Sequence, residues 1–263
     1  MRSKSIVLVV AALAVAFGAA GASARSHTQI TVFAAASLTD VFPAIDNAQR
    51  YSFGGSNALA TQISNGAPAD VFASANTAIP AQLFAKGVVE KPVSFTRNTL
   101  VIVVPKSNPA GIKTVYDLAK PGVKIDVASS AVPVGSYTLQ ILGNMNLTAK
   151  VTANVVSQET DVREVLAKVA LGQADAGFVY STDAKTVPGQ VTVIKMPAWA
   201  QPKITYALAV VTKSPNQAGA RAFIAKVLSK SGQAKMLEYG FLPLVKPAEK
   251  KPPKIVHPAK KKR

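Results

Sequence analysis

Hydrogen-bond donors, rather than acid–base pairs, mark four points where a strand-like run passes into a helical pattern. Ser37 opens the first helical pattern, and Ser56 opens the second directly after two glycines. The third pattern begins around Val134 and the fourth at Val162. The first amides of a helix have no acceptor within the helix, so these junctions offer free N–H groups beside hydroxyls. Gathered in one place, such neutral donors would bind an anion.

Each junction taken alone also has a simpler explanation in helix capping. Ser37 and Asp40 have the spacing of a capping box, and Asp161 and Glu164 have the same spacing at the fourth junction. Capping would use these polar groups to satisfy the helix ends and leave nothing for a ligand. An anion site is therefore predicted if the four junctions meet in space.

Enzymatic chemistry has little support in this sequence. There is no Cys, which excludes thiolate nucleophiles and thiolate zinc sites. His27 and His257 lie near the two ends, so no His is available to activate a serine in the body of the chain. The segment 54–58 departs from the G-x-S-x-G nucleophile motif at its last position. We therefore predict a protein that is not an enzyme and needs no cofactor.

The elements that would position the donors alternate between strands and helices. Amphipathic helical spacing is clearest over 162–170, and Pro43 should shorten the helix that starts near Leu38. This alternation predicts an α/β protein with largely parallel sheets, and no internal repeat is visible. The apolar, strand-like runs are 30–34, 51–53, 69–73, 99–104, 124–128, 175–180 and 204–211.

The two ends of the chain differ in composition from its body. Residues 1–24 combine two basic residues, an apolar run and a small-residue cleavage site, a pattern typical of a secretory signal peptide. Residues 246–263 hold seven Lys, one Arg and one acidic residue, which predicts a disordered basic tail with a net charge of +7. Of the total net charge of +17, these ends leave +8 for residues 25–245. Nucleic acid is not a predicted partner, because no basic stripe is interleaved with aromatic residues.

Six motifs resemble, in order along the chain, those of periplasmic molybdate-binding proteins, the solute-binding components of bacterial molybdate and tungstate ABC transporters. The resemblance runs from about residue 28 to residue 244, nearly the whole body of the chain. The motifs are the segments 30–40, 52–56, 66–72, 161–163, 177–180 and 239–241.

The resemblance implies a type II periplasmic binding protein fold, with two lobes, two mixed and mostly parallel sheets, and a ligand cleft between the lobes. Lobe 1 would comprise residues 25–104 plus 208–245, and lobe 2 residues 105–207. The chain would then cross between lobes near Val104-Pro105 and again near Ala207-Leu208.

The resemblance also implies a ligand and its contacts. The ligand of the family is molybdate or tungstate, held as a tetrahedral oxyanion by hydrogen bonds, with no direct ligand to the metal ion. Carried over by motif, Ser37 and Ser56 offer hydroxyl and amide groups, Val134 and Val162 offer backbone N–H groups, and Tyr180 offers its phenol. The implied partners are an ABC permease and its ATPase, and the implied state is a periplasmic monomer.

Two features depart from the family pattern, and two other functions stay open. The stretch between Asp40 and Phe53 is short, which would alter the surface of lobe 1 near Ser56. Val134 stands where a smaller residue is common, so its side chain would narrow the cleft. The alternatives are a binding protein for another oxyanion such as sulfate, or a surface-adhesive protein whose basic tail contacts an anionic membrane.

Overall fold

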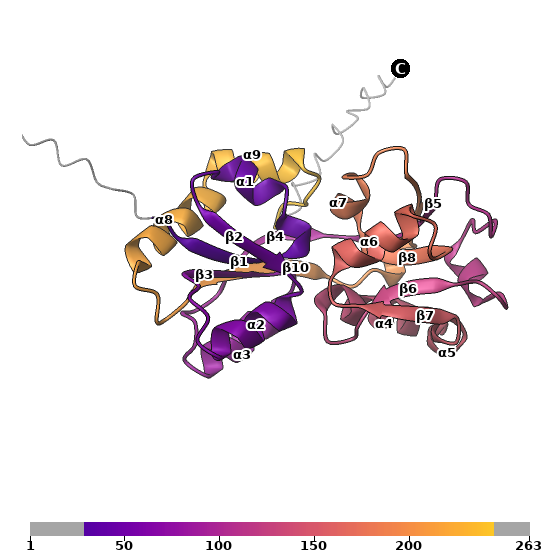
Figure 1. Cartoon of the computed structure of the whole chain (residues 1–263), viewed down its shortest axis with the longest axis horizontal. Helices are drawn as coiled ribbons and strands as arrows, with labels where there is room; N and C mark the ends of the chain where they lie inside the picture. The colour runs from indigo at the N-terminus through magenta and orange to yellow at the C-terminus, as the bar shows by residue number, and fades with distance from the viewer. Residues whose placement is uncertain (1–28, 245–263) are drawn as a thin grey trace, which may run out of the picture.

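The computed structural model describes residues 29–244, which form two sheets side by side, each covered by helices on both faces (Figure 1). We call the half that contains β1 (Thr31–Ala35) lobe 1 and the half that contains β6 (Ile125–Ala128) lobe 2. The predicted signal peptide, 1–24, and the predicted basic tail, 246–263, lie outside the described residues. The α/β fold class with two mixed sheets is confirmed.

The sheet of lobe 1 has the strand order β2-β1-β3-β10-β4. Strand β1 pairs in parallel with both β2 and β3, whereas β10 runs antiparallel to β3 and to β4. Four of the five strands therefore point the same way. The strands are β1 (Thr31–Ala35), β2 (Arg50–Gly54), β3 (Val71–Ser74), β4 (Val93–Asn98) and β10 (Ile204–Val210).

The sheet of lobe 2 has the order β7-β6-β8-β5-β9 and repeats the same topology. Strand β6 pairs in parallel with β7 and β8, and β5 is the reversed strand between β8 and β9. In both lobes the reversed strand is the one that the chain enters after crossing from the other lobe. The strands are β5 (Leu100–Pro105), β6 (Ile125–Ala128), β7 (Val155–Glu159), β8 (Ala176–Tyr180) and β9 (Val191–Lys195).

Helices cover both faces of each sheet. In Figure 1, α1, α8 and α9 lie above the sheet of lobe 1 and α2 and α3 below it, while α6 and α7 lie above the sheet of lobe 2 and α4 and α5 below it. The α-helices are α1 (Val41–Ile45), α2 (Ser56–Ser64), α3 (Ala78–Ala85), α4 (Pro133–Asn144), α5 (Thr148–Thr152), α6 (Val162–Ala170), α7 (Ser181–Ala184), α8 (Gln217–Leu228) and α9 (Lys230–Glu238). Short 3-10 helices span Ala36–Leu38, Val115–Ala119 and Ala198–Ala200.

The predicted crossings near Val104-Pro105 and near Ala207-Leu208 both fall inside strands, and the structure corrects them. The chain changes sheet at Thr99, between β4 and β5, and again between β9 and β10. The whole run Leu100–Pro105 belongs to lobe 2 and the whole of β10 to lobe 1. The first crossing was placed wrongly because β5 is buried along its full length, and nothing in its composition marks the boundary between the lobes.

The strands that the sequence did not predict are all edge strands. β4, β7 and β9 each lie at one end of a sheet and mix exposed with buried residues. An edge strand lacks the continuous apolar run of a central strand, because part of it faces solvent. The helices α3, α5 and α7 were also missed, whereas Pro43 sits, as expected, in a helix of one short turn.

The amphipathic helix predicted over 162–170 is confirmed as α6, and it packs closely against β8. Gly177 in β8 makes this approach possible, since a Cβ atom there would lie 2.7 Å from Cγ1 of Val165 and 2.9 Å from Cγ2 of Val169. The close packing fixes where α6 begins, and its first residue, Val162, faces the space between the lobes.

Candidate functional site

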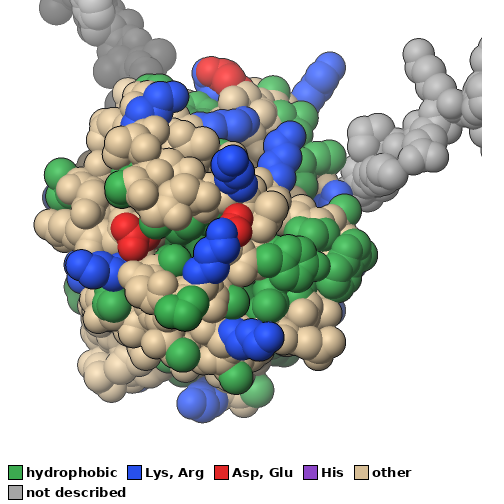
Figure 2. All heavy atoms as spheres, turned by 90° about the vertical axis from the view of Figure 1, so that its right-hand side faces the viewer, with side chains coloured by type: hydrophobic (Ala, Val, Ile, Leu, Met, Phe, Trp, Pro, Cys, Tyr) green, Lys and Arg blue, Asp and Glu red, His purple; other side chains and the backbone are tan. Residues whose placement is uncertain are grey.

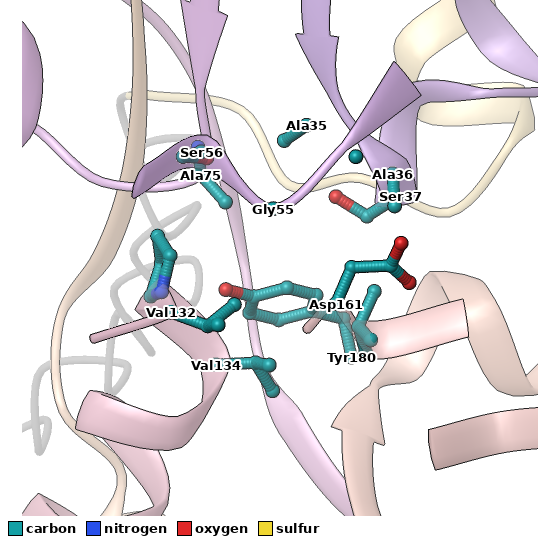
Figure 3. Close-up of a pocket in the computed structure, with 13 residues that line it drawn as sticks. Ala35, Ala36, Ser37, Gly55, Ser56, Ala75, Val132, Val134, Asp161 and Tyr180 are labelled. Atoms are coloured by element: carbon teal, nitrogen blue, oxygen red, sulfur yellow. The ribbon is translucent and has the colours of Figure 1, made fainter. Parts of the chain in front are cut away.

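One pocket lies where the two lobes meet, and all five sequence-predicted site residues line it (Figure 3). Its cavity volume, measured as the space open to the centre of a water molecule, is about 10 Å³. Its walls come from the loops after β1, β2 and β3 in lobe 1, and from the loops after β6 and β7 and the end of β8 in lobe 2. The lining residues are Ala35, Ala36, Ser37, Gly54, Gly55, Ser56, Ala75, Val132, Pro133, Val134, Asp161, Val162 and Tyr180.

Lobe 1 brings two buried serines to this pocket. Ser37 lies in the 3-10 helix that follows β1, and its Oγ is 2.9 Å from the hydroxyl oxygen of Tyr206. Ser56 is the first residue of α2, and its Oγ accepts a hydrogen bond of 3.1 Å from the amide of Ala75. The predicted capping box of Ser37 and Asp40 is wrong, because Ser37 bonds to Tyr206 and Asp40 makes no side-chain cap.

Lobe 2 contributes two helix N-termini whose first amides face the pocket. Helix α4 begins with Pro133, which has no N–H, and has no side-chain cap, so the amide of Val134 has no acceptor within the helix. At α6, the Asp161 carboxylate accepts from the amides of Arg163 and Glu164, at 2.7 and 3.2 Å. The predicted capping by Asp161 is thus confirmed, and it leaves the amide of Val162 free of the cap.

Tyr180 ends β8 with its side chain in the pocket wall. Its hydroxyl is fully buried and makes no hydrogen bond to any of the described residues. Burial raises the pKa of the Tyr180 phenol well above its ordinary value, so the phenol keeps its proton. A buried hydroxyl without a partner costs folding free energy, which makes it a group prepared for a ligand.

The pocket is electrically neutral apart from one engaged carboxylate. No Lys, Arg or His lines it, and the single acidic residue, Asp161, caps α6. In Figure 3 the oxygens of Ser37 and Tyr180 are directed toward the space between the labelled residues of the two lobes. The arrangement can therefore offer several hydrogen-bond donors, from side chains and from helix N-termini, to one small anion.

Beside the pocket, Arg163 links the two lobes. Its Nη2 contacts Oδ2 of Asp40 in lobe 1 at 2.5 Å, and its Nε contacts Oδ1 of Asp183 in lobe 2 at 2.7 Å. Burial raises the pKa of Asp183 to about 6, although the guanidinium of Arg163 favours the ionised carboxylate. This bridge was missed at the sequence level, although Arg163 belongs to one of the six motifs.

A second contact between the lobes explains why residue 55 is a glycine. A Cβ atom on Gly55 would lie 2.3 Å from the carbonyl oxygen of Thr160, which belongs to lobe 2. The backbone angles of Gly55, φ −63° and ψ 130°, are open to any residue. Glycine is therefore required here by the approach of the opposite lobe and not by backbone conformation.

Comparison with known proteins identifies the family. A model of the bacterial extracellular solute-binding proteins matches residues 30–242. The molybdate-binding protein ModA of Mycobacterium tuberculosis is 38% identical over 251 residues, covering 90% of this chain and 95% of that protein. ModA of Haemophilus influenzae is 32% identical and covers 84% and 92%. The chain belongs to the ModA family.

Solved structures agree with this assignment at the level of the fold. The periplasmic molybdate-binding protein of Azotobacter vinelandii has a TM-score of 0.71 at 24% identity, covering 81% of this chain and 99% of that chain. The sulfate-binding protein SubI of Mycobacterium tuberculosis has the same TM-score of 0.71 at 22% identity, covering 83% and 88%. As a member of the ModA family, the protein is a non-enzymatic, extracellular component of transport.

The described residues, 29–244, carry neither a metal-binding cluster nor a membrane-spanning helix. In this range no three His, Cys, Asp or Glu side chains gather in a group that could hold a metal ion. None of the helices in the same range has the length and apolar character needed to cross a membrane. At the end of lobe 2 seen in Figure 2, the described Lys and Arg side chains are spread between uncharged groups rather than joined in one stripe.

Proposed function

We propose that the protein captures molybdate or tungstate in the pocket between its lobes and releases it to an ABC importer. The observation that carries the proposal is the donor set: two serine hydroxyls, one phenol and the uncapped amides of Val134 and Val162 line a pocket without a cationic side chain. Ser37, Ser56, Val134, Val162 and Tyr180 are the proposed ligand contacts.

The physical basis is complete satisfaction of the ligand's acceptors. Molybdate is a dianion with four oxygens that accept hydrogen bonds and no proton to donate. Each hydrogen bond to a charged group contributes roughly 1.5–3 kcal/mol net. The N-termini of α2, α4 and α6 add positive partial charge without a mobile counter-ion. The hydroxyl of Tyr180 exchanges an unsatisfied state for a charge-assisted bond.

Selectivity follows from the same donor set. A protonated phosphate brings a donor that would face donors, so chemistry disfavours it. Sulfate has the shape and charge of molybdate but is smaller, so some of its hydrogen bonds would be too long. Molybdate and tungstate are nearly equal in size and charge, and the pocket treats them alike.

Delivery requires partners outside this chain. We infer that the lobes close on the anion by a hinge at the two crossing segments, and that the closed monomer docks on a membrane permease with its ATPase. Export to the periplasm would use the predicted signal peptide, 1–24.

A thermal-shift titration of the ligand-free protein tests the proposal. Molybdate, tungstate, sulfate and phosphate are compared at equal concentration and ionic strength. At about 100-fold excess over Kd, binding adds roughly 2.7 kcal/mol, which raises Tm by about 5–10 °C. We expect this rise with molybdate and tungstate. An equal or larger rise with sulfate would favour a sulfate-binding protein, and no rise with any oxyanion would refute the proposal.

A further inference from the structure

A chain of hydrogen bonds runs behind the pocket and ends on Ser37. The Oγ of Ser37 lies 2.9 Å from the hydroxyl of Tyr206 in β10, and the hydroxyl of Tyr206 lies 3.4 Å from Nδ2 of Asn98 at the end of β4. Ser37, Tyr206 and Asn98 are all buried, at 3%, 0% and 3% exposure. Bulk water is therefore kept away from these three side chains, and the proton of Tyr206 must go to one of its neighbours.

The backbone fixes the orientation of the Asn98 amide. Its Oδ1 accepts a hydrogen bond of 2.9 Å from the amide of Thr99 and one of 3.1 Å from the hydroxyl of Ser181. Its Nδ2 donates to Oγ1 of Thr182 at 2.9 Å. Because a backbone N–H can only donate, the side-chain oxygen must face Thr99 and the NH₂ group must face Tyr206.

This orientation sets the direction of the proton on Tyr206. The NH₂ group of Asn98 has no lone pair to offer, and the hydroxyl of Tyr180 makes no hydrogen bond to any described group. The remaining acceptor is Oγ of Ser37. Tyr206 therefore donates to Ser37, and the proton of Ser37 is left to point into the pocket that Ser37 lines (Figure 3). Burial raises the pKa of Tyr206 well above its ordinary value, so the donor keeps its proton.

The hydroxyl of Ser56 is oriented in the same way as that of Ser37, but by a backbone amide. Its Oγ accepts a hydrogen bond from the amide of Ala75 at 3.1 Å, and a backbone amide cannot reverse. The proton of Ser56 is thus also free for the pocket. Of the two serines, one is oriented by the backbone and the other by a side chain, and only the second can be altered by substitution.

We propose that Tyr206, held by Asn98, is a positioning residue that makes Ser37 a hydrogen-bond donor toward the pocket and so selects unprotonated oxyanions. Because both serine oxygens receive a hydrogen bond from behind, each serine directs its own proton toward the pocket, where a protonated oxyanion would meet a donor instead of an acceptor. The inference rests on the proposed function and deepens it, since it names the residue that gives the donor set its direction.

The experiment is a double-mutant cycle with Tyr206→Phe and Ser37→Ala, read by calorimetric titration with molybdate and by competition with phosphate near pH 6. In the Tyr206→Phe variant Ser37 can rotate and accept, so we expect molybdate affinity to fall about tenfold. The preference for molybdate over phosphate should fall by a comparable factor. In the Ser37→Ala background, Tyr206→Phe should have almost no further effect, because it acts through Ser37.

Tyr51→Phe is the matched control. The Tyr51 hydroxyl donates to backbone carbonyls of Phe42 and Asp46 in the same lobe, away from the pocket, so its loss should leave the preference unchanged. The positioning role of Tyr206 would be overturned by additive effects in the cycle. It would also be overturned if Tyr206→Phe kept the preference of the unaltered protein for molybdate over phosphate. Either result would leave the proposed function standing. Failure of the unaltered protein to bind molybdate or tungstate would overturn both.

Discussion

The two lobes build one site from the same topology with different chemistry. The loop after β1 places Ser37 in the pocket and the equivalent loop after β6 places Val134; the loop after β2 places Ser56 and that after β7 places Val162. Lobe 1 thus offers side-chain hydroxyls where lobe 2 offers backbone amides. At the third pair of strands only lobe 2 contributes a donor, the phenol of Tyr180, because the amide of Ala75 in lobe 1 already donates to Ser56.

The difference shows which positions of a binding site leave a trace in the sequence. A site made of hydroxyls requires Ser or Tyr, whereas a site made of amides requires a helix start and tolerates an apolar side chain such as valine. Lobe 1 is therefore sensitive to its side chains at the site, and lobe 2 to the geometry of α4 and α6. Substitutions that separate these two dependences test the comparison.

The largest effect is expected from Gly55→Ala, which adds a methyl group on the lobe 1 side of the contact with Thr160. A Cβ at 2.3 Å from the Thr160 carbonyl oxygen prevents the lobes from meeting as they do here. Within lobe 1 alone, the backbone angles of residue 55 are ones that alanine adopts without strain. We expect affinity for molybdate to fall about 100-fold, roughly 2.8 kcal/mol, measured by calorimetric titration. The Tm of the ligand-free protein should change by no more than about 2 °C.

Gly143→Ala provides the control for this substitution. It makes the same chemical change inside α4, where the new Cβ would meet nothing closer than Oγ1 of Thr148 at 3.9 Å. Molybdate affinity should be unaltered. A Gly55→Ala variant that binds as tightly as this control would show that the contact between Gly55 and Thr160 is not needed for capture.

Tyr180→Phe removes the one side-chain donor that lobe 2 contributes. Loss of a hydrogen bond to a charged ligand should weaken molybdate binding between roughly tenfold and a hundredfold. The ligand-free protein should be as stable as before or more stable, because the buried hydroxyl has no partner among the described residues. Calorimetric titration checks the predicted affinity, and thermal unfolding checks the predicted stability. Unaltered affinity would remove Tyr180 from the site.

The sequence predicted which residues meet in space better than it predicted the boundaries of the lobes. The five proposed site residues follow motifs and junctions that can be read locally, and all five line one pocket. The crossings at Thr99 and between β9 and β10 could not be read in this way, because β5 is as apolar as a central strand of either lobe. Tyr206 and Asn98 were also missed, since their roles depend on neighbours more than 80 positions away in the chain.

One short sequence feature occurs at equivalent positions in the two lobes. Asp70 precedes β3 and accepts from the amide of Thr31 at 2.7 Å, and Asp175 precedes β8 and accepts from the amide of Lys124 at 2.8 Å. Each aspartate follows an alanine and ties the third strand of its sheet to the first. Two residues in each lobe are too few to be recognised as a repeat, so the duplication emerged from strand order alone.

A buried carboxyl group in lobe 2 makes the stability of the protein depend on pH. Both oxygens of Asp126 in β6 are buried without a hydrogen-bond partner, and burial, with the nearby Glu159, raises the pKa of this carboxyl from 3.8 to about 7 against the opposing charge of Lys168. From about pH 4 to 7 the folded chain holds a proton that the unfolded chain has lost, so this group's contribution to stability falls as the pH rises.

Asp126→Asn should therefore stabilise the protein more at pH 8 than at pH 5. We expect the difference in Tm between the variant and the unaltered protein to grow by about 2–4 °C over that interval, on the order of 1 kcal/mol. Asp70→Asn is the comparison in lobe 1, where both carboxylate oxygens are hydrogen-bonded, and it should destabilise at either pH. A Tm difference for Asp126→Asn that does not vary with pH would show that Asp126 does not titrate in this range.

The smallest effect is expected from Asp40→Asn, which weakens the ion pair of Arg163 across the lobes. Asp40 is 43% exposed, so solvent screens the pair, and its contribution should be about 0.2–1 kcal/mol. Because the pair joins the lobes beside the pocket, its loss should speed molybdate release up to about fivefold, and the effect should shrink in high salt. Glu90→Gln breaks an ion pair with Arg221 inside lobe 1 and should leave the release rate unchanged. Stopped-flow displacement by tungstate measures both rates, and equal rates for the two variants would assign Asp40 and Arg163 to the surface of the lobes rather than to their closure.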